Sequence, residues 1–330
     1  MKIRSVLVSA VAGLLLSMGT ASAAEYTMRL SHQFPPAHHT AINLEQFAKE
    51  VAQETDGAVE VQIFGAAQLF KPAQHHAAVA GGEIESAVIL SLQWGSTIPL
   101  MSVSIIPYLM SAPEKQQGFL KSDAAKLLDQ KMLERGVRNI AWLVDANDLL
   151  ITSSTQLLDS PEKFDGVKIR GLNRMFDYGL EAMGAVPVTM PGSEVYQALQ
   201  TGVVDAGITG VPAAYARKFY EVQSYGAASA GLLVFDNLVV NPAWWDGLPE
   251  DVRAGIERAA DAAVQRSLIL HDGVAPEDLA KLVDAGMEAV ALTPEQVEAM
   301  KNAMQPAVRE QFLKATGDEG QKLIDLIEGL

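Results

Sequence analysis

The order of apolar and polar positions predicts strands and helices that alternate along the chain. Short apolar or alternating runs bounded by Gly, Pro and Asp-Gly turns indicate strands, and longer runs with helical spacing indicate helices. The first block has strands at residues 26–31, 59–63 and 84–90, with helices at 39–55 and 72–80. This β-α-β-α-β order favours parallel strands joined by right-handed crossovers.

A second block with the same order lies between Phe164 and Gly210. Its strands are predicted at 167–170, 185–189 and 203–208, with helices from Asn173 to Gly184 and from Pro191 to Thr201. Asn is a favoured N-cap, and Gly commonly ends a helix. Ligands of parallel sheets bind beyond the carboxyl ends of the strands. Arg170 and Thr209 stand at two such ends and are candidate site residues.

The remaining segments connect and follow these blocks. The predicted helices lie near 113–121, at 122–134, from Pro249 to about 272 or onward to 284 with a bend at Pro276, and from Thr293 to Leu330 with an interruption at Pro306; the predicted strands lie at 137–144, 149–152, 231–240 and 287–292. Two blocks on either side of residue 148 indicate two α/β lobes.

The first residues read as a secretory signal peptide. Lys2 and Arg4 precede an apolar run at 6–18 that is too short to span a bilayer, and Ala21-Ser22-Ala23 is a cleavage site of the Ala-x-Ala type. We expect cleavage after Ala23 and a periplasmic location, with an uncleaved anchor as the alternative. The chain has no cysteine, so we expect no lipid anchor, disulfide or thiol chemistry.

Composition narrows the function classes. The chain is 49% hydrophobic and 20% charged, which supports a sizeable core rather than wholesale disorder. Acidic residues outnumber basic ones by 40 to 25, which argues against nucleic acid as a partner. Removing Lys2 and Arg4 leaves 23 basic residues against 40, a net charge of −17. Solubility and a salt-exposed source are both possible reasons for this acidity.

The sequence carries no enzyme signature. G-x-S-x-G, the P-loop, H-E-x-x-H and G-x-G-x-x-G are all missing. The pairs His38-His39 and His75-His76 are adjacent, and adjacent helical positions point about 100° apart. We therefore expect neither pair to bind a metal, and we expect no cofactor and no enzymatic activity.

Three motifs in the second block resemble a known family. They are Lys168-Ile169-Arg170, Gly184-Ala185-Val186-Pro187-Val188, and the run from Glu194 to Asp205, EVYQALQTGVVD. In this order they resemble the solute-binding subunits of tripartite ATP-independent periplasmic (TRAP) transporters, in the DctP-like branch. The resemblance extends over essentially the whole mature chain.

The resemblance implies an α/β fold, the two-lobe clamshell of periplasmic binding proteins with a long helix spanning both lobes. Lobe I would be 24–147 plus 236–275, and lobe II would be 148–235 plus 276–330. The implied function is capture of a small polar organic solute, a carboxylate or zwitterion, for small and large permease components, with the chain a monomer. Alternatives are a binder of a small amine or amino alcohol, a ligand sensor for a receptor, and an enzyme on the same scaffold.

The resemblance also points to site residues. In the family, the arginine corresponding to Arg170 grips the substrate carboxylate, and a guanidinium fork matches a carboxylate with two hydrogen bonds. An internal ion pair is the alternative for Arg170. Aromatic faces close to strand ends form cleft walls. The other candidates, which lie in or near loops that line the cleft in this fold, are Phe34, His39, Gln93 and Trp94.

Three departures from the family pattern bear on the ligand. Most relatives have a second arginine where Leu149 stands here, with Asp148 beside it. Thr209 replaces an amide, and Asp236 stands where a neutral contact is common. Carboxylates in the cleft would bind an ammonium group and repel a dicarboxylate. The alternative is that Asp148 and Asp236 face water in loops. The ligand therefore stays open between a monocarboxylate such as a hydroxy acid and an amine or zwitterion.

Overall fold

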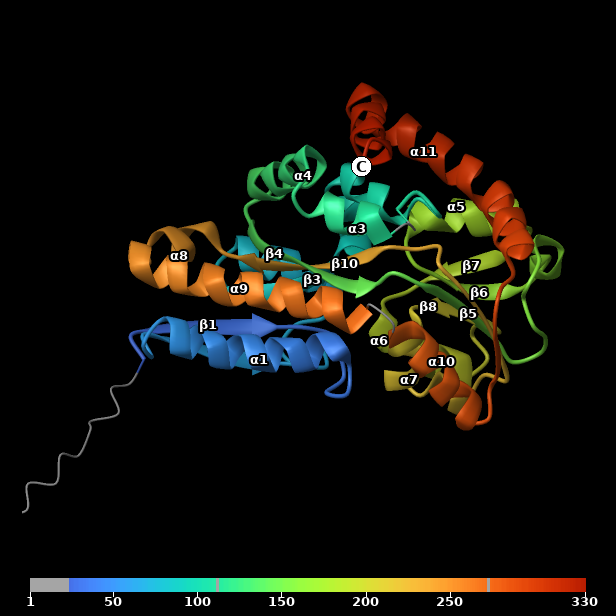
Figure 1. Ribbon diagram of the computed structural model, residues 1–330, viewed down its shortest axis with the longest axis horizontal. Helices are drawn as coiled ribbons and strands as arrows, with labels where there is room; N and C mark the ends of the chain where they lie inside the picture. The colour runs from blue at the N-terminus through green and yellow to red at the C-terminus, as the bar shows by residue number, and fades with distance from the viewer. Residues whose placement is uncertain (1–23, 111–112, 272–273) are drawn as a thin grey trace, which may run out of the picture.

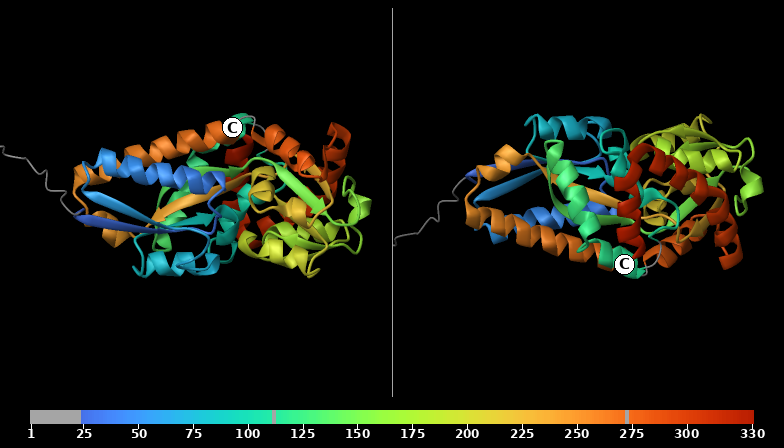
Figure 2. Two further views of the ribbon diagram at one scale, coloured as in Figure 1. Left: turned by 90° about the horizontal axis from the view of Figure 1, so that it is seen from below. Right: turned by 90° about the horizontal axis from the view of Figure 1, so that it is seen from above.

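Two β-sheets with helices packed against them form the two halves of the molecule (Figure 1). The computed structural model describes residues 24–110, 113–271 and 274–330, so the predicted signal peptide lies outside the described residues. Figure 2 shows the two halves end to end along the long axis, with the C-terminus near their junction. This arrangement confirms the predicted two-lobe α/β fold class.

The first sheet has the strand order β2-β1-β3-β10-β4. Its strands are β1 (Tyr26–Ser31), β2 (Val59–Phe64), β3 (Ser86–Leu90), β4 (Arg138–Ala146) and β10 (Val234–Val240). β1 is parallel to β2 and β3, whereas β10 runs antiparallel between β3 and β4. β3 and β10 are buried along their whole length, which explains their continuous apolar runs.

The second sheet has the strand order β11-β9-β5-β8-β6-β7. Its strands are β5 (Leu149–Ser153), β6 (Lys168–Gly171), β7 (Val186–Thr189), β8 (Ala206–Thr209), β9 (Tyr225–Ser229) and β11 (Glu288–Ala291). β6 is parallel to both β7 and β8, as the second block predicts. The chain crosses between the sheets after β4 and returns to the first sheet as β10.

Helices cover both sheets and connect the halves. They are α1 (His39–Glu54), α2 (His75–Ala80), α3 (Pro113–Phe119), α4 (Asp123–Glu134), α5 (Arg174–Ala182), α6 (Gly192–Gln200), α7 (Val211–Ala216), α8 (Pro242–Asp246), α9 (Glu250–His271), α10 (Val274–Asp284) and α11 (Pro294–Glu328), with 3₁₀ helices η1 (Pro72–Gln74), η2 (Ser91–Ser96), η3 (Pro99–Ile105), η4 (Pro161–Phe164) and η5 (Phe219–Glu221). α9 packs on α1 and β4, whereas α10 packs on α7 and β11. α11 contacts α5 on one side and η3 and α4 on the other, so this long helix reaches both halves.

The last helix corrects one prediction. α11 continues through Pro306, and its non-helical backbone lies instead at Gly317, with φ 59° and ψ −142°. Glycine takes a positive φ without the Cβ clash that other residues meet, so the chain turns there. After the turn, Leu323 and Ile327 pack into a cluster that includes Phe235 of β10. The end of α11 therefore packs against the first sheet's half.

None of the helices within the described ranges is long and apolar enough to cross a membrane.

Candidate ligand-binding site

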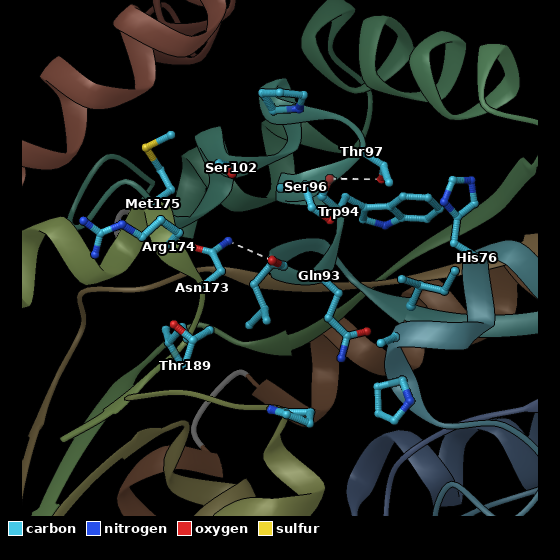
Figure 3. A pocket seen from close by; sticks show the side chains of 18 of the residues that line it. His76, Gln93, Trp94, Ser96, Thr97, Ser102, Asn173, Arg174, Met175 and Thr189 are labelled. Atoms are coloured by element: carbon cyan, nitrogen blue, oxygen red, sulfur yellow. Dashed lines mark hydrogen bonds between the residues drawn. The ribbon is translucent and has the colours of Figure 1, made fainter. Parts of the chain in front are cut away.

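A pocket of about 840 Å³ lies between the two halves (Figure 3). The first half contributes side chains from α2 and η2, and the second contributes side chains from α5 and from the segment after β7. Residues that line it include Pro72, His76, Gln93, Trp94, Ser102, Leu172, Asn173, Tyr178, Thr189, Met190 and Pro191. A ligand here would contact both halves at once.

Gln93 and Trp94, two of the predicted site residues, form part of this wall. The Trp94 ring packs edge-on against His76, with centroids 4.9 Å apart, and its Nε1 donates to Asn237 Oδ1 at 3.0 Å. Gln93 Oε1 accepts from Leu90 N, but its buried Nε2 has no hydrogen-bond partner within the described part of the chain. A buried unsatisfied amide is costly, so Gln93 Nε2 is a donor suited to a ligand.

Arg170 stands at the end of β6 and is 3% exposed. Its Nε and Nη2 donate to Met190 O at 3.3 and 3.2 Å, and its Nη1 donates to Ile208 O. A guanidinium has five N–H donors, so within the described part of the chain three are bound to carbonyl oxygens and two remain. Burial, helped by the charge of Arg217, lowers the pKa of Arg170 to about 9. Met190 also lines the pocket, although Arg170 itself does not.

Two buried carboxylates, Asp145 and Asp236, lie close together on the neighbouring strands β4 and β10. The Thr40 hydroxyl lies 2.9 Å from Asp236 Oδ2 and 3.4 Å from Asp145 Oδ1. Burial and the neighbouring carboxylate of Asp145 hold the pKa of Asp236 well above its usual value. Sequence reasoning missed Asp145, although it directly follows the apolar run of a predicted strand.

Asp148 lies beside α7, away from the pair that Asp145 and Asp236 form. Its Oδ1 accepts a hydrogen bond from Val211 N at 3.0 Å, in the first turn of α7. This contact satisfies a donor at the start of the helix and gives Asp148 a structural role. Asp148 is 6% exposed and Asp236 is fully buried, so the alternative that both face water is wrong. The acid beside Asp236 is Asp145.

Phe34, His38 and His39 form a stack at the start of α1. The ring centroids are 4.5 Å apart for Phe34 and His38 and 4.4 Å apart for His38 and His39. The expectation that the two histidines face apart is wrong because His38 is the N-cap, with φ −74° and ψ 136°, and lies outside the helix. Asp145 Oδ1 is 3.7 Å from His38 Nε2 and 3.8 Å from His39 Nε2.

His38, His39 and Asp145 each have one possible metal-ligand atom, and these three atoms lie within 4.8 Å of one another. However, His38 Nδ1 accepts a hydrogen bond from Thr40 N, which leaves the proton of the neutral ring on Nε2. That nitrogen, 3.7 Å from Asp145 Oδ1, therefore carries a proton and cannot ligate a metal. Burial lowers the pKa of His39 to about 4, so His39 is neutral at pH 7. The arrangement fits a hydrogen-bonded wall better than a metal centre.

Thr209 and Arg217 lie near Arg170, Asp145 and Asp236, and these five residues are called the charged region below. Thr209, at the end of β8, is 6% exposed, and its Oγ1 accepts from Arg217 Nη1 at 3.3 Å. Arg217 follows α7 and is half-buried. Burial lowers the pKa of Arg217, whereas the negative charges of Asp145 and Asp236 act in the opposite direction. Sequence reasoning did not select Arg217, because no motif places it near the cleft.

Asn173 connects the two halves beside the pocket. It is the N-cap of α5, as predicted, and its Oδ1 accepts from Phe176 N at 3.0 Å. Its Nδ2 donates to Leu92 O of η2 at 2.7 Å, a bond between the halves that is drawn in Figure 3. The Asn173 side chain therefore caps α5 of the second half and also forms a hydrogen bond with η2 of the first half.

We expect Asn173→Asp to favour an open form. Aspartate keeps the capping acceptor but loses the donor and places negative charge near the Leu92 carbonyl. Removing such a bond typically costs about 1–3 kcal/mol. Small-angle X-ray scattering of the ligand-free protein should show a larger radius of gyration.

Asn241→Asp is a matched control for this change. Asn241 caps α8 through Trp244 N and donates to Val79 O, but both contacts lie within the first half. This variant should lose stability without an increase in the radius of gyration. Equal radii for Asn173→Asp and the unchanged protein would contradict the role of Asn173.

Two α/β halves around a shared pocket, with a buried cation and buried acids at the junction, define a clamshell solute-binding protein. The sequence profile of the family described as "Bacterial extracellular solute-binding protein, family 7" (DctP) matches residues 30–315. The chain therefore belongs to this family of solute receptors. This confirms the relation to TRAP solute-binding subunits, the solute-binding function and the absence of enzymatic activity that the sequence predicts.

Several named proteins are similar to the chain along nearly their whole length. The C4-dicarboxylate-binding periplasmic protein DctP of Rhodobacter capsulatus is 30% identical over 325 residues, 96% of each chain. The ectoine-binding periplasmic protein TeaA of Halomonas elongata is 27% identical, covering 96% of this chain and 93% of the relative. A TRAP periplasmic solute-binding protein from Desulfovibrio salexigens, solved with bound orotic acid, superposes with a TM-score of 0.86 at 28% identity and 92% and 98% coverage.

Proposed function

We propose that the ligand is a small organic acid with a hydroxyl or ammonium group near its carboxylate. Arg170 binds the carboxylate, and the Asp145–Asp236 pair accepts from the donor group. The observation that carries this proposal is the buried guanidinium of Arg170, which three backbone hydrogen bonds hold in place.

The carboxylate follows from the chemistry of Arg170. A buried charge is costly unless an opposite charge and hydrogen bonds compensate it. Backbone carbonyls fix the plane of the guanidinium and leave two N–H groups, which suit the two oxygens of one carboxylate. An amine without a carboxylate would leave this cation unmatched.

The donor group follows from the acidic pair. Asp145 and Asp236 offer acceptor oxygens, and even with the raised pKa of Asp236 the pair keeps negative charge, so it favours a ligand hydroxyl or ammonium and repels a second carboxylate. Relatives are named for a C4-dicarboxylate and for ectoine, and one was solved with orotic acid. Family members therefore differ in ligand, so the ligand of this chain has to be inferred from its own residues. Phe34, His39, Gln93, Trp94 and Thr209 would line the site, whereas Asp148 would support it through α7.

A thermal-shift screen tests the proposed ligand class. Matched three-carbon acids show which ligand groups matter. Propionate lacks a donor, lactate has a hydroxyl, alanine has an ammonium group and malonate has a second carboxylate. Pyroglutamate, glucuronate and ectoine extend the panel to rings, and ethanolamine lacks the carboxylate. A ligand at 100 times its Kd should add about 2.7 kcal/mol of stability. We expect acids with a donor to stabilise most; the strongest effect from malonate or ethanolamine would contradict the proposal.

We also propose the finer features of the transport role. The chain would be made with a signal peptide that is cleaved after Ala23, and it would act in the periplasm as a monomer. It would deliver its ligand to the small and large membrane components of a TRAP transporter. The moving lobes would be 24–147 plus 236–275 and 148–235 plus 276–330, centred on the two sheets, although the end of α11 after Gly317 packs against the first half.

A further inference from the structure

Leu149, at the start of β5, is fully buried among apolar side chains and brings no charge to the region around Arg170. Arg217 brings a second guanidinium to the charged region from a different element, the end of α7.

The guanidinium groups of Arg170 and Arg217 form hydrogen bonds with two consecutive residues of β8. Arg170 Nη1 donates to the carbonyl of Ile208, and Arg217 Nη1 donates to the hydroxyl of Thr209 at 3.3 Å. These residues form the carboxyl end of the strand. The two cations are therefore neighbours at the edge of the sheet where ligands of such folds bind.

Two small residues admit the Arg217 side chain. Gly192 opens α6, and a Cβ at this position would lie 2.9 Å from Arg217 Nη2 and 3.0 Å from Cζ. Any larger residue would therefore displace the guanidinium. Thr209 has a short side chain, and its hydroxyl accepts the hydrogen bond from Arg217. The position of Arg217 thus depends on side chains of β8 and α6.

The charges around Arg217 favour an anion between the two arginines. The neighbouring positive charge of Arg217 lowers the pKa of Arg170, which shows that the two cations repel each other. Asp145 and Asp236 face this region from the first sheet, Asp177 influences Arg170 from α5, and His39 from α1 is neutral at pH 7. One carboxylate placed between the two guanidinium groups would relieve their repulsion.

We propose that Arg217 is a second ligand-binding arginine that shares the ligand carboxylate with Arg170. Its guanidinium, at the end of α7, brings a second positive charge to the carboxyl end of β8. The site then has two arginines of the second half on the carboxylate and two aspartates of the first half on the donor group. This inference rests on the proposed organic-acid ligand.

Calorimetric titration of Arg217 variants tests the inference. The probe is the acid of the thermal-shift panel that stabilises the unchanged protein most. Arg217→Gln removes the charge and should weaken its binding about 10- to 100-fold. Arg217→Lys keeps the charge without the fork and should lose less. Lys218→Gln is the control, since Lys218 is exposed and pairs with Glu221 at 3.4 Å, and its affinity should not change.

A double-mutant cycle with Arg170→Lys shows whether both arginines bind one group. Groups that act on the same carboxylate are coupled, so the combined loss should be smaller than the product of the single losses. Unchanged affinity in Arg217→Gln, or losses that multiply independently, would overturn the inference while the organic-acid ligand stands. If no acid of the panel stabilises the unchanged protein, the proposed function fails and the inference with it. Circular dichroism establishes that each variant is folded.

Discussion

Arg170→Ala should weaken binding of the stabilising acid by at least about 100-fold, because a charged hydrogen-bonding partner of the carboxylate is lost inside the protein. The substitution also leaves the carbonyl oxygens of Met190 and Ile208 without the donors that Arg170 supplies. Some loss of stability should therefore accompany the loss of binding. Isothermal titration calorimetry measures the affinity, and thermal unfolding measures the stability.

Two further variants separate binding from folding. Arg170→Lys keeps a positive charge but cannot form the planar fork, so its affinity should lie between those of alanine and arginine. Lys168→Ala removes an exposed cation from the same strand and should leave the affinity unchanged. Full affinity in a folded Arg170→Ala protein would exclude Arg170 from the site.

Phe235→Ala should lower the free energy of unfolding by about 3–5 kcal/mol, as is typical when a large buried ring is removed. Phe235 is fully buried on β10, and its ring centroid lies 4.9 Å from that of Phe119 and 5.4 Å from that of Trp142. Removal of the Phe235 ring would leave a cavity behind Asp236 and Asn237, the next residues of this strand. Ligand affinity should therefore fall as well.

Denaturant unfolding measures the predicted loss. Leu69→Ala is the control, because Leu69 is 38% exposed and its truncation should change the free energy of unfolding by no more than about 0.5 kcal/mol. A loss for Phe235→Ala as small as that of the control would mean that the aromatic cluster of Phe119, Trp142 and Phe235 contributes little to the stability of β10.

The sequence determined those features that depend on neighbouring residues. The predicted strands and helices agree with the structure to within a few residues because side-chain periodicity reflects which face is buried. Strand β9 and helix α7 were not predicted from the sequence. The caps at Asn173 and Thr293 were predictable because each side chain bonds to backbone three residues onward. Arg170 could be predicted as a candidate site residue because its strand end and its motif are local, and the same motifs indicated the family.

Only the tertiary structure decided which distant charges meet. Asp145, not Asp148, lies beside Asp236, because the chain crosses between sheets after β4 and Asp148 turns to α7. Arg217 reaches Thr209 beside Gly192 of another helix, where a Cβ would lie 2.9 Å from Arg217 Nη2. The composition of the site depends on close approach between elements far apart in sequence, and neither periodicity nor local motifs carry that information.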